Sequence, residues 1–438
     1  MKKILTPLLI TLLLITSFIS VQAVSLSDID LINLNSNFAT VTEVYQDETR
    51  VLYQKNADAS MYPASLTKIL TNYTAILNGP SLDTLVTIQY EDIAGLAEEN
   101  ASVAGFYEGQ VVTFRDLLYG SMLPSGADAS NAIARVISGS VPAYVELMNQ
   151  TALELGLNNT NFINTTGLFE ENHTTTTNDI ALLTQIALKN DLFKEIFSTL
   201  NYTSPETEYN PGGLELESTI LLYSQYDEEK IGYIMGGKTG WLSESGYCLS
   251  SYADFYDRTY VITTCDAYNI GDNLVDHNII YQFLFENQHE ITILNENQKL
   301  GDVHLIYQDN PDHYTIYNDE KIVKNLPIVI DYEDLDIDVN FISEIETPVA
   351  KGTPIGSVNI TLADETVLET EYSFEEDIER NNFMYYTHSL INYFTSSAFI
   401  ELLIKIIVVL LLIFVLILLY SRLRRRNQQK GKYKGLKL

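Results

Sequence analysis

A serine and a lysine three residues apart could form a nucleophile and its base. The stretch MYPASLTKIL places Pro63 and Ala64 before Ser65 and Lys68 three positions after it. If the proline starts a helix, Ser65 lies in the first turn and Lys68 one turn later on the same face. A serine hydroxyl attacks only when a base takes its proton, and a lysine is that base only when its amine is neutral. The spacing alone also fits an ordinary helix start with a solvated lysine.

Another motif, GGKTGW, supplies groups that would complete such a site. Lys238 adds a second cation, which favours the neutral form of a nearby lysine. Thr239 can donate a hydrogen bond to a substrate carboxylate, and Gly240 lets a peptide lie close along a strand edge. The backbone N–H groups of Ser65 and Trp241 are suited to stabilise an oxyanion. Both motifs in one chain indicate an acyl-transfer enzyme.

The two ends of the chain predict export and a membrane anchor. Residues 1–23 combine a basic start, an apolar middle and small residues at the end, which is typical of a signal peptide cleaved after Ala23. A retained N-terminal membrane helix is the alternative. Residues 401–420 are long and apolar enough for a transmembrane helix, and the basic tail 421–438 predicts a cytoplasmic C-terminus. The sequence therefore predicts a cell-membrane protein with a single C-terminal anchor and an extracytoplasmic catalytic domain.

Composition excludes several classes of protein. Between residues 24 and 400 the chain has 57 Asp and Glu against 15 Lys and Arg, a charge that repels nucleic acid. Its two cysteines, Cys248 and Cys265, are too few for a disulfide scaffold or a cysteine-rich metal site. They lie in neighbouring strand-like runs, so they could form a cross-strand pair or be two small buried side chains.

Strand-like runs enclose a helical middle. Alternation and turn residues predict a hairpin at 40–56 and strands at 231–240, 246–253 and 259–265, whereas helical spacing covers 114–138, 142–156 and 177–190. This order favours an α+β domain in which helices pack on an antiparallel sheet. Residues 290–375 read as a small all-β module. Residues 376–400 predict a stalk or an interfacial segment.

Longer stretches around both motifs resemble the D-alanyl-D-alanine carboxypeptidase family, the low-molecular-mass penicillin-binding proteins. The resemblance is carried by VLYQKNADASMYPASLTKILT, LLYGSMLPSGADASNAIA, FINTTGLFEENHTTTTNDIALL, GGKTGWLSESGYCLSSYA and TPVAKGTPIGSVNITL. It covers about residues 40–375. It implies a β-lactamase/transpeptidase-like domain at 24–285 and a β-rich C-terminal domain at 290–375. It also implies an enzyme that needs no metal or cofactor.

The resemblance assigns roles to individual residues. The catalytic residues would be Ser65, Lys68 and Ser125, and the substrate-binding residues would be Lys238, Thr239, Gly240 and Trp241. Ser65 would be acylated, Lys68 would accept its proton, and Ser125 would relay a proton to the leaving D-alanine. The implied partners are the peptidoglycan stem peptide as substrate and β-lactam antibiotics as covalent inhibitors.

One position departs from the family pattern. The second motif is usually Ser-x-Asn, but Ala127 takes the place of the asparagine, which removes an amide that would orient the lysine and hold the substrate carbonyl. A peptidoglycan-binding or scaffold protein with little turnover is therefore the alternative. A β-lactamase is a third interpretation, which lacks an identifiable deacylating carboxylate between the second and third motifs.

Four other polar residues near these motifs have simpler interpretations. His173 could belong to a Ser-His-Asp triad, but its Thr-rich surroundings favour a structural hydrogen-bonding role. Asp128 and Asp179 are interpreted as helix-start or network residues, and Glu244 as a solvated loop carboxylate. Trp241, the single tryptophan, could form a wall of the substrate groove or pack in the core.

Overall fold

The computed structural model describes residues 26–46, 48–308, 311–363 and 365–433. The predicted signal peptide, residues 1–23, lies outside the described residues, as does the end of the basic tail from residue 434. The chain divides into two compact units. The catalytic unit comprises the described residues up to Ile291 together with Lys324–Tyr332, and the second unit comprises Thr292–Val323 and the described residues from Glu333 onward.

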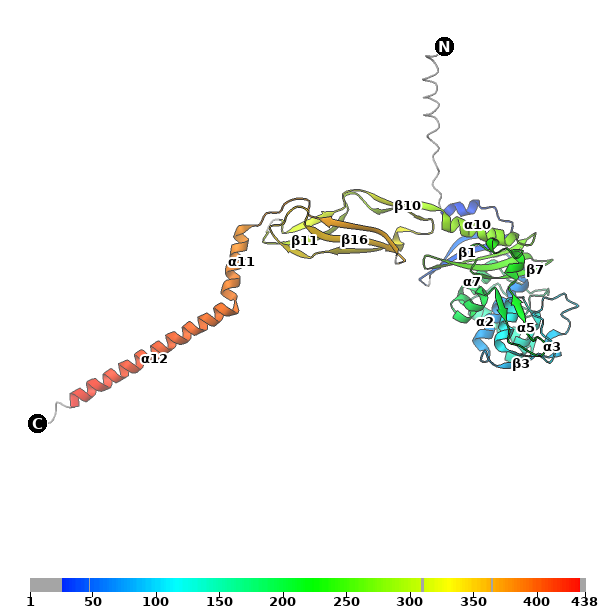
Figure 1. Ribbon diagram of the computed structural model, residues 1–438, viewed down its shortest axis with the longest axis horizontal. Coiled ribbons are helices and arrows are strands. Elements are labelled where there is room, and N and C mark those ends of the chain that lie inside the picture. The colour runs from blue at the N-terminus through cyan, green and yellow to red at the C-terminus, as the bar shows by residue number, and fades with distance from the viewer. Residues whose placement is uncertain (1–25, 47, 309–310, 364, 434–438) are drawn as a thin grey trace, which may run out of the picture. The chain divides into compact units, whose positions relative to one another are not determined.

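A five-stranded antiparallel sheet forms the centre of the catalytic unit (Figure 1). Its strands are β1 (Phe38–Tyr45), β2 (Glu48–Lys55), β7 (Gly236–Leu242), β8 (Gly246–Phe255) and β9 (Arg258–Ala267). Their order is β2-β1-β9-β8-β7, so β7, which contains the GGKTGW motif, is an edge strand. An edge strand keeps one side of its backbone free to pair with a peptide.

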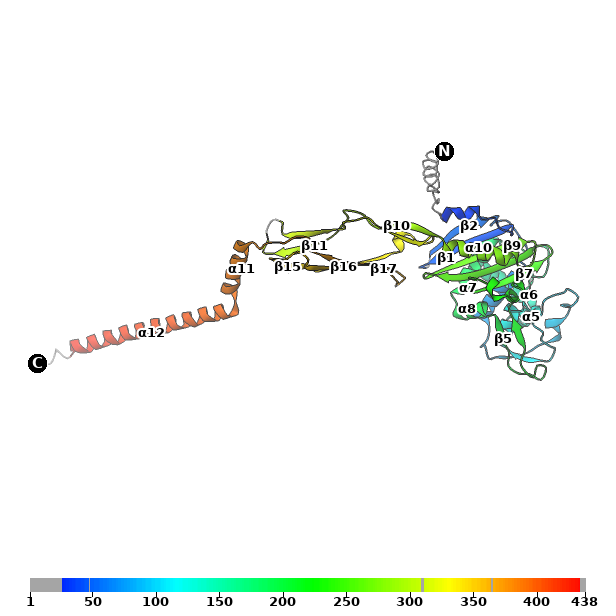
Figure 2. The same cartoon turned by 45° about the horizontal axis from the view of Figure 1, so that its top comes forward.

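Helices cover both faces of this sheet, as the alternation of side chains on β8 shows. The hydroxyl of Ser250 lies 2.9 Å from that of Thr184 on α7, whereas the next hydroxyl, Ser251, bonds His277 and Tyr281 on α10. Figures 1 and 2 show α10 on one side of the sheet and α7 on the other. The helices are α2 (Thr67–Asn78), α3 (Tyr90–Ile93), α4 (Phe114–Met122), α5 (Ala127–Ser138), α6 (Val141–Glu154), α7 (Thr177–Leu188), α8 (Asp191–Ser198), α9 (Thr219–Tyr223) and α10 (Asp272–Glu286).

Short elements complete the catalytic unit. The 3-10 turns are η1 (Leu26–Leu31), η2 (Ala64–Leu66) and η3 (Glu228–Lys230), and two small sheets pair β3 (Leu85–Thr87) with β4 (Val111–Thr113) and β5 (Asn201–Thr203) with β6 (Glu215–Glu217). The main core packs α2, α4, α5, α6 and α7 around one another and against the sheet. Helix α2 is buried along nine of its 12 residues, so the helix that follows Ser65 is fixed in the core.

Two predicted elements differ from the structure. The helical spacing over 114–138 covers two helices, because Pro124 and Gly126 interrupt it and Ser125 takes a left-handed φ of 65° between them. The strand predicted at 231–240 begins only at Gly236, because residues 231–233 form a turn and residues 234–235 are irregular. The break between α4 and α5 therefore places Ser125 at a bend, which the regular spacing of apolar residues over 114–138 does not reveal.

The second unit contains two three-stranded sheets and a small core. One sheet has the order β12 (His313–Tyr317), β11 (Lys299–Ile306), β15 (Glu344–Glu346), and the other has the order β14 (Asp336–Phe341), β16 (Pro354–Leu362), β17 (Glu365–Ser373). The core residues are Val303, Leu305, Ile316, Val349, Ile355 and Phe374. A two-stranded sheet pairs β10 (Gln288–Leu294) with β13 (Ile322–Pro327), and η4 spans Tyr332–Asp334.

Two helices end the described chain. Helix α11 (Asn382–Thr395) lies within the segment 376–400 that is predicted to be a stalk or an interfacial segment, and it buries none of its side chains. Helix α12 (Ser397–Tyr433) contains a segment, Ser397–Asn427, that is long and apolar enough to span a membrane. The predicted C-terminal transmembrane helix therefore has a physical counterpart in α12.

Candidate active site

The Ser65 side chain is presented by a tight turn in front of α2. Ala64 takes a left-handed φ of 48°, which is strained for a residue with a Cβ, and Ser65 follows it within η2. Lys68 lies one turn later, and its Nζ donates a hydrogen bond to Ser65 Oγ at 3.1 Å. The spacing that predicted a nucleophile beside a base thus brings the two atoms into hydrogen-bond contact.

Burial gives Lys68 the properties of a base. The side chain is 2% exposed, and its Nζ also donates to the carbonyl oxygen of Thr166 at 2.5 Å. Burial lowers the pKa of Lys68 to about 7, against the opposing attraction of Asp128. Near neutral pH a large fraction of the amine is therefore uncharged and able to take a proton from Ser65.

Ser125 lies at the bend between α4 and α5. Its side chain is buried, and its Oγ has no hydrogen-bond partner among the described residues. It lines a groove of about 470 Å³ together with Ser65 and Lys68. A buried hydroxyl without a partner is costly, so this one is available to a substrate or a water in the groove.

Strand β7 forms the opposite side of the groove. Thr239, Gly240 and Trp241 line it, whereas Lys238 is 1% exposed and lies behind this lining. Lys238 Nζ donates to the carbonyl of Thr239 at 2.9 Å. Burial first, and the charge of Lys68 second, hold the pKa of Lys238 well below its usual value. Lys238 therefore contacts the backbone of β7 from behind the groove, and its burial favours the neutral amine.

Two residues that the sequence analysis missed support the same strand. Thr219, the first residue of α9, accepts a hydrogen bond from Thr239 Oγ1 at 2.5 Å and also lines the groove. Tyr223 donates its hydroxyl to the carbonyl of Gly240 at 3.0 Å. Neither residue stands in a motif with catalytic spacing, and both lie about 20 residues before the strand that they hold.

Two glycines let the backbone close around Ser65. A Cβ on Gly240 would lie 2.9 Å from the backbone nitrogen of Ser65, so β7 passes directly against the start of α2. A Cβ on Gly167, where φ is +79°, would overlap the carbonyl oxygen of Ala64. The predicted oxyanion donors, the N–H groups of Ser65 and Trp241, therefore belong to two backbone segments in close contact.

His173 holds the turn rather than activating the serine. Its Nδ1 accepts a hydrogen bond from Ile163 N at 3.0 Å, so Nε2 carries the proton and donates to Thr67 Oγ1 at 2.8 Å. Thr67 Oγ1 donates in turn to the carbonyl of Ala64 at 2.8 Å. Burial, with a contribution from Lys68, lowers the pKa of His173 to about 4. The predicted structural role of this histidine is confirmed.

The acidic residues near the motifs also have structural roles. Both carboxylate oxygens of Asp128 accept backbone N–H groups from the segment 104–106, at 2.7 to 3.1 Å. Asp179 lies in the first turn of α7 and accepts from Thr160 Oγ1 at 2.7 Å. Glu244 is exposed and accepts from its neighbour Ser243. Network, helix-start and solvated-loop roles were the predictions for these three residues.

Trp241 and Ala127 both line the groove. The indole is 55% exposed, with its ring 5.9 Å from that of Tyr247, so it forms a wall and does not pack in the core. Ala127 is buried, and its N–H donates to the carbonyl of Ser102 at 2.8 Å. An asparagine at this position would bring an amide to the groove beside Lys68.

Neither a disulfide nor a metal cluster is part of the described catalytic unit. Cys248 on β8 and Cys265 on β9 are buried free thiols, and burial raises the pKa of Cys265 well above its usual value. In the part of the chain that the structure describes, no three His, Cys, Asp or Glu side chains gather closely enough to hold a metal ion.

Known proteins resemble the chain in sequence and fold. A family model described as D-alanyl-D-alanine carboxypeptidase matches residues 32–267. The D-alanyl-D-alanine carboxypeptidase DacF of Bacillus subtilis is 27% identical over 393 residues, covering 88% of this chain and 96% of its own. The crystal structure of the Streptomyces K15 DD-transpeptidase superposes with a TM-score of 0.52 at 30% identity, covering 57% of this chain and 97% of that one. Penicillin-binding protein 5 of Haemophilus influenzae has the same fold, with a TM-score of 0.52 at 22% identity over 80% of this chain and 99% of that one.

Proposed function

The chain belongs to the D-alanyl-D-alanine carboxypeptidase family, and from this premise we propose that it is a serine-type enzyme with Ser65 as its nucleophile. Membership makes it a hydrolase of the carboxypeptidase and penicillin-binding type. One observation supports the serine mechanism above all: Lys68 Nζ lies 3.1 Å from Ser65 Oγ, and the lysine is buried. Its substrate is the D-alanyl-D-alanine end of a peptidoglycan stem peptide.

In the acylation step Ser65 Oγ attacks the carbonyl carbon between the two D-alanines. The hydroxyl proton passes to the neutral amine of Lys68, which its lowered pKa makes available near pH 7. The carbonyl oxygen becomes an oxyanion that the N–H groups of Ser65 and Trp241 stabilise. The close approach of β7 to the turn at Ser65 supports this pair of donors.

Release of D-alanine needs a proton on its nitrogen. Ser125 Oγ lines the same groove and has no other hydrogen-bond partner among the described residues, so it carries the proton from Lys68 to the leaving amine. The C–N bond then breaks and leaves the ester on Ser65. Water hydrolyses this ester, with Lys68 accepting the water proton and Ser65 regaining its hydroxyl hydrogen.

The substrate carboxylate is held at β7. Thr239 and Thr219 share a hydrogen bond in the groove, which leaves a threonine hydroxyl to donate to a carboxylate. Lys238 lies directly behind and adds positive potential when protonated. Gly240 and Trp241 provide the free strand edge and the aromatic wall along which the peptide lies.

The proposed organisation places the enzyme on the outer face of the cell membrane. Residues 1–23 are the signal peptide, 24–285 the carboxypeptidase domain, 290–375 the β-rich domain and 376–400 the stalk. The transmembrane helix at 401–420 is followed by a cytoplasmic tail at 421–438. The apolar length of α12 and the basic residues that follow it support this orientation.

Labelled penicillin and a stem pentapeptide test the proposal together. The full-length protein in detergent should form a covalent penicillin adduct on Ser65 and release D-alanine from the pentapeptide. Ser65→Ala should do neither, while Ser60→Ala, an exposed serine five residues earlier, should do both. Undiminished labelling of Ser65→Ala would contradict the proposal that Ser65 is the nucleophile. Labelling without D-alanine release would favour the low-turnover binding protein instead.

A further inference from the structure

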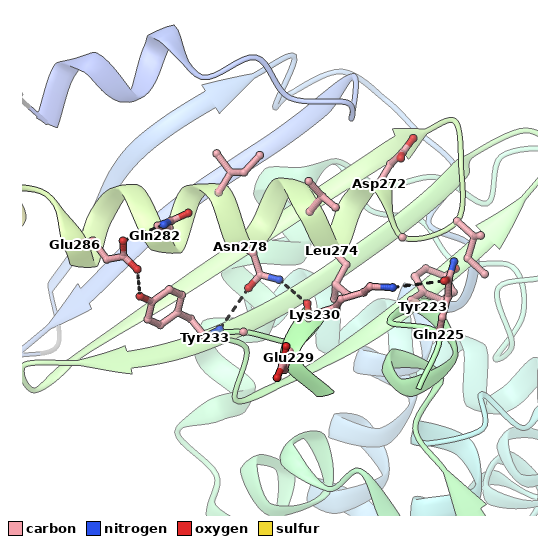
Figure 3. A pocket seen from close by; sticks show the side chains of 15 residues that line it. Tyr223, Gln225, Glu229, Lys230, Tyr233, Asp272, Leu274, Asn278, Gln282 and Glu286 are labelled. Atoms are coloured by element: carbon pink, nitrogen blue, oxygen red, sulfur yellow. Dashed lines mark hydrogen bonds between the residues drawn. The ribbon is translucent and has the colours of Figure 1, made fainter. Parts of the chain in front are cut away.

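A second groove adjoins the catalytic one. It has a volume of about 550 Å³ and lies between α10 and the segment 225–233 (Figure 3). Tyr223 and Ile270 line both this α10 groove and the catalytic groove. These two side chains are therefore a shared wall of the two grooves.

One face of α10 forms the floor of this groove. Val275, Ile279, Gln282 and Glu286 recur every three or four residues, so they follow one side of the helix, and all four line the groove. Val275 is 50% and Ile279 is 40% exposed, which is high for apolar side chains on a packed helix. A 15-residue helix is about 22 Å long, which corresponds to roughly six residues of extended peptide.

The other wall is fixed to α10 by hydrogen bonds. Asn278 Nδ2 donates to the carbonyl of Lys230 at 2.7 Å, and Tyr233 donates its hydroxyl to Glu286 at 2.5 Å. Gly232 has a φ of +59°, and a Cβ there would overlap the side chain of Asn278. Figure 3 shows these side chains bridging the two walls, so the groove is formed without a ligand.

The charges in the groove favour a cationic ligand. Its lining contains Glu229, Asp272 and Glu286 against the single cation Lys230, which already faces Asp227 at 3.6 Å. Hydrogen bonds from Tyr233 and Gln282 lower the pKa of Glu286, which keeps its carboxylate charged. A ligand with an amino group beside apolar atoms matches this combination of acidic and apolar side chains.

We propose that the α10 groove binds the second stem peptide of a cross-linked pair while the first presents its D-alanyl-D-alanine end to Ser65. The inference rests on the proposed function and names its preferred substrate class, an amine-bearing cross-linked peptide dimer. Length supports this occupant. The three residues that precede the D-alanine pair in a pentapeptide span about 10 Å when extended, so a single stem peptide is too short to fill both grooves.

Release of D-alanine from two substrates tests the inference with the full-length protein. The substrates are a monomeric stem pentapeptide and a cross-linked dimer with a free amino group. Ile279→Lys should lower kcat/KM for the dimer about tenfold, mainly through KM, because it adds bulk and positive charge to the groove floor. The same variant should change kcat/KM for the monomer less than about twofold. Leu153→Lys, a matched change on the exposed side of α6, should affect neither substrate.

A milder variant tests whether the negative charge of Glu286 in the α10 groove contributes to binding of the dimer. Glu286→Gln should lower, about threefold, the preference for the dimer over its N-acetylated form. Equal losses on monomer and dimer, or no loss on the dimer, would overturn the α10 groove as a substrate site. Release from both substrates with no dependence on Ile279 removes this inference alone. No release from either substrate by the unaltered protein removes the proposed function and this inference with it.

Discussion

Two lysines share the site, and burial affects both. Lys68 donates a hydrogen bond to Ser65 and has its pKa lowered to about 7, while Lys238 is enclosed behind Thr239 and has its pKa held well below the usual value. A buried ammonium group loses its hydration, so the neutral amine is favoured at both positions. At the residue scale, desolvation therefore makes the Lys68 amine suitable for the proposed role of base without a histidine.

The pH dependence of acylation follows from Lys68. Below pH 7 the amine is protonated and cannot accept the Ser65 proton, so kcat/KM should fall about tenfold for each pH unit below this value. Above pH 7 it should level off. Second-order rates of penicillin labelling, measured between pH 5 and 8.5, test this dependence of acylation on pH. A flat profile across that range would mean that Lys68 is not the base, because His173, with a pKa of about 4, titrates too low to replace it.

Ala127 gives a second prediction at this scale. Ala127→Asn should raise kcat/KM for D-alanine release about fivefold, since one added hydrogen bond to the lysine or the substrate contributes about 1 kcal/mol. Ala132→Asn, also buried on α5 but absent from the groove lining, is the control and should only destabilise the protein. An unchanged rate for Ala127→Asn would show that the missing amide does not limit turnover.

At the scale of elements, the site depends on backbone segments that meet at one turn. The segment through Gly167 and strand β7 through Gly240 both approach the strained turn at Ala64, and His173 fixes that turn through Thr67. The break between α4 and α5 brings Ser125 to the same groove. Precise placement of Ser65 is therefore shared by four separate segments of the chain.

A pair of glycine substitutions separates close packing from backbone strain. Gly167→Ala should lower stability by more than about 2 kcal/mol and slow penicillin acylation, because its Cβ would overlap the Ala64 carbonyl. Gly139→Ala has nearly the same φ, +78°, with no atom within 4 Å of the new Cβ, so it should cost about 1 kcal/mol and leave acylation unchanged. Thermal unfolding and labelling rates measure both effects. Equal behaviour of the two variants would contradict the close approach at Ser65.

The motifs and the fold class could be predicted from the sequence, but the supporting contacts could not. Ser65 and Lys68 were recognisable because an i, i+3 spacing fixes their relation within one helix. Thr166 contributes a backbone carbonyl, which any residue type provides, and Thr219 and Tyr223 act on a strand about 20 residues away. Pro124 and Gly126 mark the break at Ser125 in the sequence, although apolar periodicity continues on both sides of it. Long-range backbone contacts leave no local pattern in a sequence.

At the scale of the whole molecule, one apolar helix could anchor the protein in a membrane. The segment Ser397–Asn427 of α12 is apolar enough to cross a bilayer, and α11 before it exposes four aromatic side chains, Phe383, Tyr386, Tyr393 and Phe394. Tyrosine and phenylalanine next to a membrane span suit the interface between lipid and water. These two helices are therefore suited to anchor the C-terminal end of the chain in a membrane.

Deletion of residues 397–438 should move penicillin-binding activity from the membrane to the soluble fraction without changing the acylation rate. Deletion of 421–438 alone should leave the protein in the membrane, since the apolar segment remains. Cell fractionation with labelled penicillin distinguishes the two. Protease added outside intact cells should also remove the labelled unit, and protection of that unit would contradict the extracytoplasmic orientation.

The two thiols in the central sheet have a practical consequence. Since the whole sequence holds only Cys248 and Cys265, and both are unbonded and enclosed, the folded enzyme contains no covalent cross-link that a reductant could cleave. Dithiothreitol should leave its melting temperature unchanged, and bulky alkylating reagents should find no sulfur to attack until the sheet opens. The shape of the folded protein therefore does not depend on an oxidising environment.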